Sequence, residues 1–447
     1  MKTSEILFTL TRTLWSPKKL LKSSVLRNTI VLLGGDASAR IISLVALTIT
    51  VRSLGTASFG VLVLAETYAK LLDRIFTFQS WAALIRFGSM ALGEGKPDEF
   101  RGYIRLGYTL DCLSAITGAA VAYFVAPAVG GLMGWSDEIV IACRLYSFLI
   151  LFNATGTSTG ILRLTDNFSM LAVQRFTYSL IRIAGVMTVT LYHGGLISFL
   201  LAWLLSECAG YIFLNLCAQY VISKNGWGSW WSSTSRLPKK PFITFAIWTN
   251  VTSTIDIPVK FLDVFFVSYF VSVDATGIYK IFQQVSHVLK KPTEPLIQVL
   301  YPHFSNMNVH SRPRHLLRSA LKAVLALALV AFATATVLSA SSPIWLPQIF
   351  GPVFRKYVLE FTIFMLVQAY AVAVTPLSPL IVARGLVREN FLIQAAANTA
   401  FLLCIWILGS KFGFVGVISA IGVHAFISSS LRLLMINKNF NSGDRAV

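Results

Sequence analysis

The chain has 447 residues, of which 55% are hydrophobic and only 13% are charged. Soluble domains carry about 25% charged residues, so this composition excludes an ordinary soluble protein. Apolar stretches of about 20 residues recur from Val25 almost to the C-terminus, and a helix of that length crosses a bilayer. Only helices and closed barrels satisfy their backbone groups in hydrocarbon, and these stretches lack the two-residue period of barrel strands. The composition therefore predicts an all-α integral membrane protein.

The N-terminal 24 residues are polar and basic and lack the long apolar core of a cleavable signal peptide. Leu7, Leu10 and Leu14 alternate there with polar residues in a pattern that suits a short helix on the membrane surface. We expect residues 1–24 to form a basic interfacial segment.

About twelve transmembrane helices are predicted from the apolar stretches that follow. They cover residues 26–51, 57–85, 104–132, 139–162, 167–191, 195–222, 241–270, 275–301, 314–340, 357–383, 389–409 and 413–436.

Lys and Arg are concentrated in alternate loops between these helices. The basic loops include those near Lys96, Arg163 and Arg384, whereas the loops near Gly131 and Gly194 carry almost no basic residue. Such loops are retained in the cytoplasm, which predicts that both termini are cytoplasmic. The formal net charge of +19 follows from this spread of bases, so we expect membrane lipids and no nucleic acid among the partners.

A faint internal repeat relates the two halves of the chain. Residues 54–61 (LGTASFGV) align with residues 271–278 (VSVDATGI), and the same shift aligns Gly134 with Gly351. A repeat of this kind predicts two six-helix lobes in parallel orientation, related by an axis along the membrane normal.

The repeat sets the predicted domain boundaries. We expect an N-terminal six-helix lobe at 25–222 and a C-terminal six-helix lobe at 242–437. Residues 223–241, rich in Gly, Ser, Trp and Lys, are predicted to be a cytoplasmic linker, and residues 438–447 a cytoplasmic tail.

Ionisable residues lie inside the predicted spans, where they are costly and usually face a bundle interior or a water-filled cavity. Fixed bases in a cavity would offset the desolvation of an anionic substrate. The basic candidates for substrate binding are Arg40, Lys70, Arg182, Lys260 and Lys280. The acidic candidates, which could couple an ion or pair with a nearby base, are Asp36, Glu66, Asp256 and Asp263. Because several of these are four residues apart on one helix face, internal ion pairs are the structural alternative.

No motif for covalent chemistry accompanies these charges. The chain has no GxxxxGK[ST], no HExxH and no loop longer than about 20 residues, so no catalytic residue is predicted. The six histidines are scattered and the five cysteines fall in apolar stretches without CxxC spacing, so neither a metal site nor a disulfide framework is expected. A membrane-embedded glycosyltransferase or polymerase stays open as an alternative.

Two segments resemble a known superfamily. Residues 52–60 (RSLGTASFG) resemble the "R-x-LG-x-x-x-FG" junction, and residues 162–168 (LRLTDNF) the "LR…F" turn, of the multidrug/oligosaccharidyl-lipid/polysaccharide exporter (MOP) superfamily. More narrowly, the chain resembles the Wzx-type polysaccharide flippases of bacterial inner membranes over residues 23–437.

This resemblance implies two lobes around a central cavity that opens to one side of the membrane at a time. It implies a cargo of undecaprenyl-pyrophosphate-linked oligosaccharide moved to the periplasmic leaflet, with Arg40 and Lys70 the foremost bases at the pyrophosphate. Glycosyltransferases and a polysaccharide polymerase are the partners it implies. No cofactor is expected; coupling to H⁺ or Na⁺ and the identity of the sugar stay open.

Two transporters of the same fold are alternatives. A multidrug or cation antiporter should expose acids in its cavity, whereas the predicted stripes here are net basic. A flippase of lipid-linked peptidoglycan precursors is closer in chemistry. Such flippases, however, carry about two additional transmembrane spans that this chain lacks.

Overall fold

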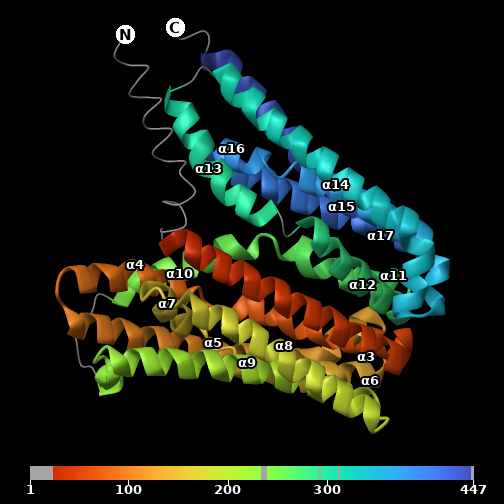
Figure 1. Ribbon diagram of the computed structural model, residues 1–447, viewed down its shortest axis with the longest axis horizontal. Helices are drawn as coiled ribbons and strands as arrows, with labels where there is room; N and C mark the ends of the chain where they lie inside the picture. The colour runs from red at the N-terminus through yellow and green to blue at the C-terminus, as the bar shows by residue number, and fades with distance from the viewer. Residues whose placement is uncertain (1–23, 233–238, 291–292, 311–312, 444–447) are drawn as a thin grey trace. The chain divides into compact units, whose positions relative to one another are not determined.

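The computed structural model describes residues 24–232, 239–290, 293–310 and 313–443, and within these ranges the chain is almost entirely helical with no strand (Figure 1). For some helical residues only the backbone is described, namely 24–37, 294–296, 298–299, 308–310, 313–314 and 439–443. The predicted surface helix in residues 1–24 lies outside the described side chains.

The helices of the first half of the chain are α3 (Ser24–Phe76), α4 (Ser80–Gly93), α5 (Pro97–Met133), α6 (Asp137–Phe152), α7 (Gly156–Leu164), α8 (Phe168–Leu191), α9 (Leu196–Lys224) and η1 (Gly228–Ser232). Those of the second half are α10 (Lys239–Thr254), η2 (Pro258–Leu262), α11 (Asp263–Phe270), α12 (Val273–Lys290), α13 (Thr293–His310), α14 (Pro313–Phe350), η3 (Pro352–Tyr357), α15 (Val358–Ala373), α16 (Leu377–Ala383) and α17 (Val387–Gly443).

Each predicted span falls on one of these helices or on consecutive helices. Seven stretches of the described residues are long and apolar enough to cross a membrane by length and composition. The two longest, Ser38–Gly93 and Val387–Lys438, each contain two or parts of two predicted spans. Within α3 and α17 the backbone departs from helical geometry at Gly55 (φ 74°) and Gly413 (φ 53°), where the sequence predicts one span to give way to the next. Glycine adopts positive φ at little cost, which explains its presence at both breaks.

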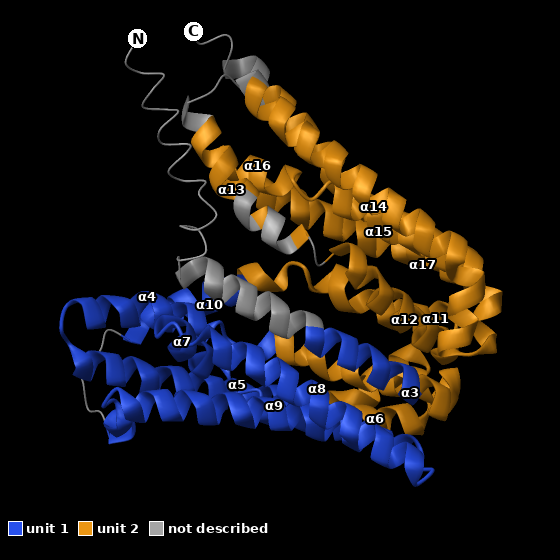
Figure 2. Ribbon diagram, viewed as in Figure 1, with its two compact units in different colours: residues 1–50, 75–124, 145–251 blue, residues 51–74, 125–144, 252–447 orange. Residues whose placement is uncertain are grey.

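The chain groups into two compact units that interleave along the sequence (Figure 2). Unit 1 comprises residues 1–50, 75–124 and 145–251, and unit 2 comprises residues 51–74, 125–144 and 252–447. Two segments of the N-terminal half therefore pack with the C-terminal helices. The division at a linker, 223–241, stays a prediction from the sequence.

Unit 1 is built on two helix pairs, α8 with α9 and α4 with α7. Its core includes Leu84, Phe100, Ile161 and Phe242, and the ring of Phe242 stacks on Tyr103 with centroids 5.5 Å apart. Lipid is as apolar as these side chains, so close packing between helices, rather than exclusion of water, holds such a core together.

Unit 2 packs α14 along α15, α13 along α16 and α11 along α17. A core cluster between these helices includes Phe304, Leu316, Leu377 and Ile381. The gap between α15 and α16 turns the chain at Val374–Pro376, and this turn forms one wall of the cavity described below.

The repeat found in the sequence has a counterpart in the contacts of unit 2. A Cβ atom placed on Gly60 of α3 would collide with the carbonyl oxygen of Val273, and one placed on Gly277 of α12 would lie 2.7 Å from the carbonyl oxygen of Thr56. The alignment pairs Gly60 with Gly277 and Thr56 with Val273. Gly60 contacts Val273, and Gly277 contacts Thr56, so the two contacts are equivalent under the repeat. We call this reciprocal contact the glycine crossing. Small residues allow two backbones to approach this closely.

The second aligned pair also has equivalent geometry. Gly134 and Gly351 each follow a long helix that contains proline, α5 and α14, and both have positive φ, 65° and 118°. Together with the glycine crossing, these positions support the internal repeat.

Candidate functional site: intramembrane charges

Three of the predicted charged residues form one cluster in unit 2. Glu66 and Lys70 lie one turn apart on α3, with Lys70 Nζ 2.6 Å from Glu66 Oε1, and Lys280 Nζ of α12 lies 2.9 Å from Glu66 Oε2. We call these three residues the two-lysine cluster. The carboxylate is buried, whereas the side chains of Lys70 and Lys280 are 34% and 23% exposed. One acid thus holds two bases that both remain partly exposed.

The cluster joins distant parts of the sequence. The Glu66–Lys70 pair follows from helical spacing, because residues i and i+4 lie on one face. The approach of Lys280 comes from the packing of α12 against α3 at the glycine crossing. Gly60 precedes Glu66 by six residues on α3, and Gly277 precedes Lys280 by three residues on α12.

Arg182 has a different environment in unit 1. Its guanidinium on α8 forms an ion pair with Glu207 of α9, and both side chains are only 8% exposed. Arg182 Nε also donates to Ser206 Oγ over 3.3 Å, and the guanidinium carbon lies 4.3 Å from the centroid of the Trp203 ring. This surrounding favours the structural alternative, an ion pair that joins two helices, for Arg182.

Lys260 and Asp256 form another predicted i,i+4 pair. Their charged groups are 3.2 Å apart and both side chains are well exposed, 59% for the lysine and 41% for the aspartate. Pro258 lies between them and opens the π-helical turn η2, in agreement with the irregular backbone that proline produces. The side chain of Lys260 is therefore more exposed than those of Lys70 and Lys280.

Asp263 is a buried acid at the start of α11. Its carboxylate accepts hydrogen bonds from the Tyr279 hydroxyl (2.6 Å), Gln283 Nε2 (2.9 Å) and the backbone N–H of Val264 (2.8 Å). Three donors satisfy the group, and the side-chain donors from α12 fix α11 against that helix.

Arg40 lies half-buried on α3 in unit 1. The side chain of Asp36, one turn earlier, lies outside the described residues, so their pairing stays a prediction. Of the predicted site residues, the structure brings together Glu66, Lys70 and Lys280, and separately Asp256 and Lys260.

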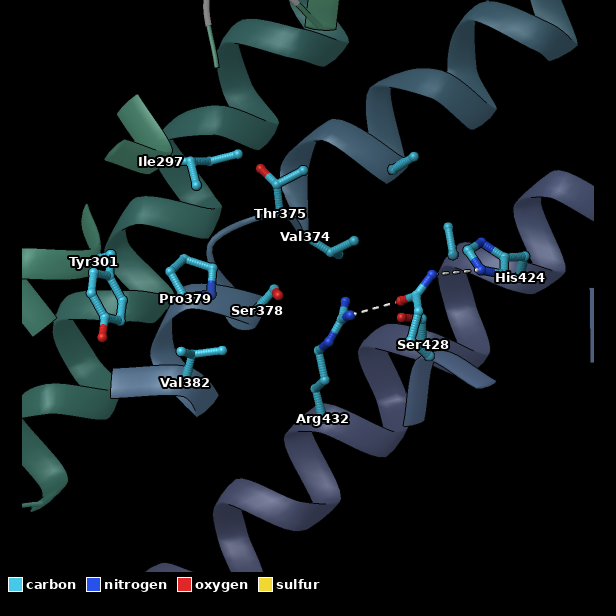
Figure 3. Close-up of a pocket in the computed structure, with 13 residues that line it drawn as sticks. Ile297, Tyr301, Val374, Thr375, Ser378, Pro379, Val382, His424, Ser428 and Arg432 are labelled. Carbon is cyan, nitrogen blue, oxygen red and sulfur yellow. Dashed lines mark hydrogen bonds between the residues drawn. The ribbon is translucent and has the colours of Figure 1, made fainter. Parts of the chain in front are cut away.

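Two charged groups, Glu207 and Arg432, were not predicted as site residues from the sequence. Glu207 stands alone in an apolar run, and the position of Arg432 near the end of a span is typical of a base at a cytoplasmic loop. In the structure Arg432 lies on α17 and lines a cavity of about 450 Å³ in unit 2 (Figure 3). The amides Asn390, Gln394 and Asn398, spaced four residues apart, are the pattern from which a polar helix face could have been recognised.

Among the described residues no group of three or more His, Cys, Asp or Glu side chains is arranged to hold a metal ion. The five cysteines are free thiols.

Comparisons with known proteins agree on the fold. An inward-facing multidrug resistance MATE family transporter of the MOP superfamily has a TM-score of 0.72 at 12% identity, covering 91% of this chain and 96% of that one. The lipid II flippase MurJ, in an inward closed conformation, has a TM-score of 0.69 at 17% identity, covering 92% of this chain and 89% of that one. Identities this low show the shared fold alone. The structural matches confirm the predicted all-α membrane fold class.

A family model identifies the family, and one curated relative is similar over part of its length. Inner membrane protein YghQ of Escherichia coli (strain K12) is 31% identical over 162 residues, which are 36% of this chain and 46% of that protein. The match thus spans less than half of that relative's length. A family model described as "Polysaccharide biosynthesis protein" matches residues 25–308, more than half of the chain. The chain is therefore a multi-span membrane protein that belongs to the polysaccharide biosynthesis protein family, as the resemblance to the MOP superfamily predicted.

Proposed function

We propose that this protein flips undecaprenyl-pyrophosphate-linked oligosaccharide from the cytoplasmic to the periplasmic leaflet of a bacterial inner membrane. The cargo is moved by alternating access, without covalent chemistry and without a cofactor. The family match and the transporter fold support a membrane flippase, and the intramembrane bases support an anionic cargo.

The two-lysine cluster is the observation that carries this proposal. A buried acid holds Lys70 and Lys280 in place while both ammonium groups stay partly exposed. Hydrogen bonds between ammonium groups and phosphate oxygens are charge-assisted and about twice as strong as neutral ones. Glu66 therefore positions the bases, and the pyrophosphate binds them from the exposed side. Arg40 and Lys260 are the further accessible candidates.

The electrical potential across the membrane would drive the proposed movement. With the inside negative, outward transfer of an anion gains about 2.3 kcal/mol per charge per 100 mV. A gradient of H⁺ or Na⁺ is the additional energy source to be measured, with Asp36, Glu66, Asp256 and Asp263 as the acids to substitute.

A cation antiporter is less well supported by the acids. Glu66 contacts two lysines and Asp263 accepts three hydrogen bonds, and both are buried. Asp256 is exposed but lies beside Lys260. A cation would have to compete with these built-in partners at each acid.

We further propose that both termini are cytoplasmic and that polysaccharide polymerase and glycosyltransferases are partners. Lys96, in the loop between α4 and α5, supports the orientation. A hydrogen bond from Lys96 to Glu94, 2.7 Å away, and the charges of Glu94 and Glu99 raise the pKa of Lys96, so it stays charged at physiological pH. Labelling of a cysteine introduced at this position, in a variant whose five native cysteines are replaced, by membrane-impermeant reagents from either side of the membrane tests the orientation.

The test of function is flipping of a fluorescent polyprenyl-pyrophosphate-oligosaccharide in proteoliposomes. We expect Lys280→Gln and Lys70→Gln to lower the rate about tenfold or more, since a hydrogen bond to a charged group contributes about 1.5–3 kcal/mol. Lys280→Arg should retain more activity than Lys280→Gln. Lys322→Gln, at an exposed position of α14, is the matched control and should flip at the wild-type rate.

Two results would decide against the proposal. Wild-type protein that moves no lipid-linked sugar but exchanges cationic drugs for protons is an antiporter. If neither lysine substitution changes the flipping rate, the two-lysine cluster has no role in transport.

A further inference from the structure

Unit 2 contains a cavity that the proposed function does not use. Its volume is about 450 Å³, and residues of α13, α15, α16, α17 and the turn between α15 and α16 line it (Figure 3). Ligand pockets of small molecules commonly measure about 300–1,000 Å³. None of the residues of the two-lysine cluster lines this cavity.

One strong cation faces this space. Arg432 Nε donates to Asn390 Oδ1 over 3.1 Å and Nη2 donates to Gln394 Oε1 over 2.9 Å. Both acceptors are neutral amides. Among the described residues no carboxylate lies within ion-pair distance of the guanidinium, and Asp256 is the acid whose charge acts on it from further away.

The amides that hold Arg432 are themselves held. Gln394 Nε2 lies 3.4 Å from Asn398 Oδ1 and 3.5 Å from His424 Nε2, and His424 Nε2 lies 3.0 Å from Asn398 Oδ1. Asn398 Nδ2 in turn donates to the carbonyl oxygen of Ile255. Because the Gln394 amide nitrogen is engaged by Asn398 and His424, its oxygen is presented to Arg432. The network fixes the orientation of the guanidinium toward the cavity.

A cation held in this way lacks a matching anion. Arg432 is half-buried, and neutral amides offset only part of the cost of moving its guanidinium out of water. Two of the three guanidinium nitrogens are engaged by the amides, and no described residue provides an acceptor for Nη1. The hydroxyls of Ser378 and Ser428 line the same space and can donate to an anion, whereas the Thr375 hydroxyl already donates to the carbonyl oxygen of Val372.

The remaining walls of the cavity are apolar. They are formed mainly by Ile297, Val374, Pro379, Val382 and Ala425. A small inorganic anion would leave these walls without a partner, whereas a hydrocarbon chain attached to the anion would cover them.

We propose that this cavity binds an amphiphile whose head is a phosphate, with Arg432 at the phosphate and the apolar walls along the chain. The guanidinium forms charge-assisted hydrogen bonds through Nη1, and the wall hydroxyls complete the shell. This site is separate from the two-lysine cluster. The proposal requires that the cavity bind the amphiphile, and it does not require that the protein flip it.

Binding to the full-length protein in neutral detergent tests the proposal. The probes are farnesyl phosphate, farnesol and inorganic phosphate, and the dissociation constants are measured by native mass spectrometry or thermophoresis. All measurements are made in wild type and repeated in Lys280→Gln, so that binding at the two-lysine cluster is separated. We expect farnesyl phosphate to bind about tenfold or more tightly than farnesol, the gain of a charged hydrogen bond. Inorganic phosphate should bind more weakly than farnesyl phosphate.

Two variants probe the two parts of the site. Arg432→Gln should weaken farnesyl phosphate binding about tenfold or more and leave farnesol unchanged. Val382→Trp places a large ring at a half-buried wall residue of the cavity and leaves Arg432 itself unsubstituted, so it should weaken the binding of both farnesyl phosphate and farnesol. Arg318→Gln, at an exposed arginine of α14 in the same unit, is the control and should bind like wild type.

Several results would overturn the proposal. Equal affinities for farnesyl phosphate and farnesol would remove the anion site, and equal affinities for farnesyl phosphate and inorganic phosphate would remove the lipid chain. An unchanged affinity in both Arg432→Gln and Val382→Trp would place binding elsewhere. Arg432→Lys keeps the charge, so if Arg432→Gln does not fold, intermediate binding by Arg432→Lys together with the loss in Val382→Trp carries the test.

Discussion

Replacing Arg182 with Met tests whether this predicted substrate base is instead a structural partner. Arg182 and Glu207 are nearly fully buried, so the substitution would leave a carboxylate inside the helix pair without its counterion. Breaking a buried ion pair from one side costs about 3–5 kcal/mol. The Tyr146 hydroxyl, 3.5 Å from Glu207, offsets part of that cost, so we expect about 3 kcal/mol.

The matched double variant Arg182→Met/Glu207→Leu removes both charges together. Apolar residues of similar volume in place of a buried pair are commonly neutral or stabilising, so we expect stability within about 1 kcal/mol of wild type. The double variant should therefore be about 2–4 kcal/mol more stable than Arg182→Met alone.

Unfolding by sodium dodecyl sulfate in mixed micelles measures these free energies, and flipping in proteoliposomes is measured on the same preparations. A structural pair predicts that the double variant regains both stability and transport. If the single variant loses less than about 1 kcal/mol, or the double is no more stable than the single, the assignment of the pair is wrong. A double variant that folds normally but no longer flips would place Arg182 at the substrate.

Two further substitutions test packing and polar contacts. Gly60→Val would drive a side chain into the Val273 carbonyl and should lower the free energy of unfolding by about 1–3 kcal/mol or more. Gly93→Val, with open space around it, should lower it by less than about 1 kcal/mol, and similar losses in the two variants would refute the glycine crossing. Asp263→Asn should lower the free energy of unfolding by about 1–3 kcal/mol, because an amide group cannot accept from all three donors, and Tyr279→Phe should lower it less. An unchanged unfolding midpoint for Asp263→Asn would contradict the hydrogen-bonded position of this acid.

The succession of helices along the chain could be predicted because membrane spans follow from length and hydropathy alone. The breaks at Gly55 and Gly413 were also predictable, since basic or small residues separate two apolar stretches there. The sequence did not show that residues 51–74 and 125–144 pack with the C-terminal helices, because that grouping depends on contacts between ends of helices far apart in the chain.

The candidate site was predictable where it is local. Helical spacing was sufficient for Glu66 with Lys70, but the arrival of Lys280 depends on how α12 crosses α3. Glu207 had no local signal, since its partner lies on the preceding helix. Arg432 was hidden by its position near the end of a span, where a base ordinarily reaches the membrane surface.

The glycine crossing has a consequence for the origin of the protein. In an isologous contact, two copies of one chain present the same patch to each other about a twofold axis. Gly60 and Gly277 meet Val273 and Thr56 in that reciprocal manner within a single chain. This is the contact expected if a six-helix ancestor first paired with itself and its gene was later duplicated and fused. Separately expressed halves should then copurify, and Gly60→Val should reduce their association; halves that associate equally well with that substitution would point to another contact as the ancestral one.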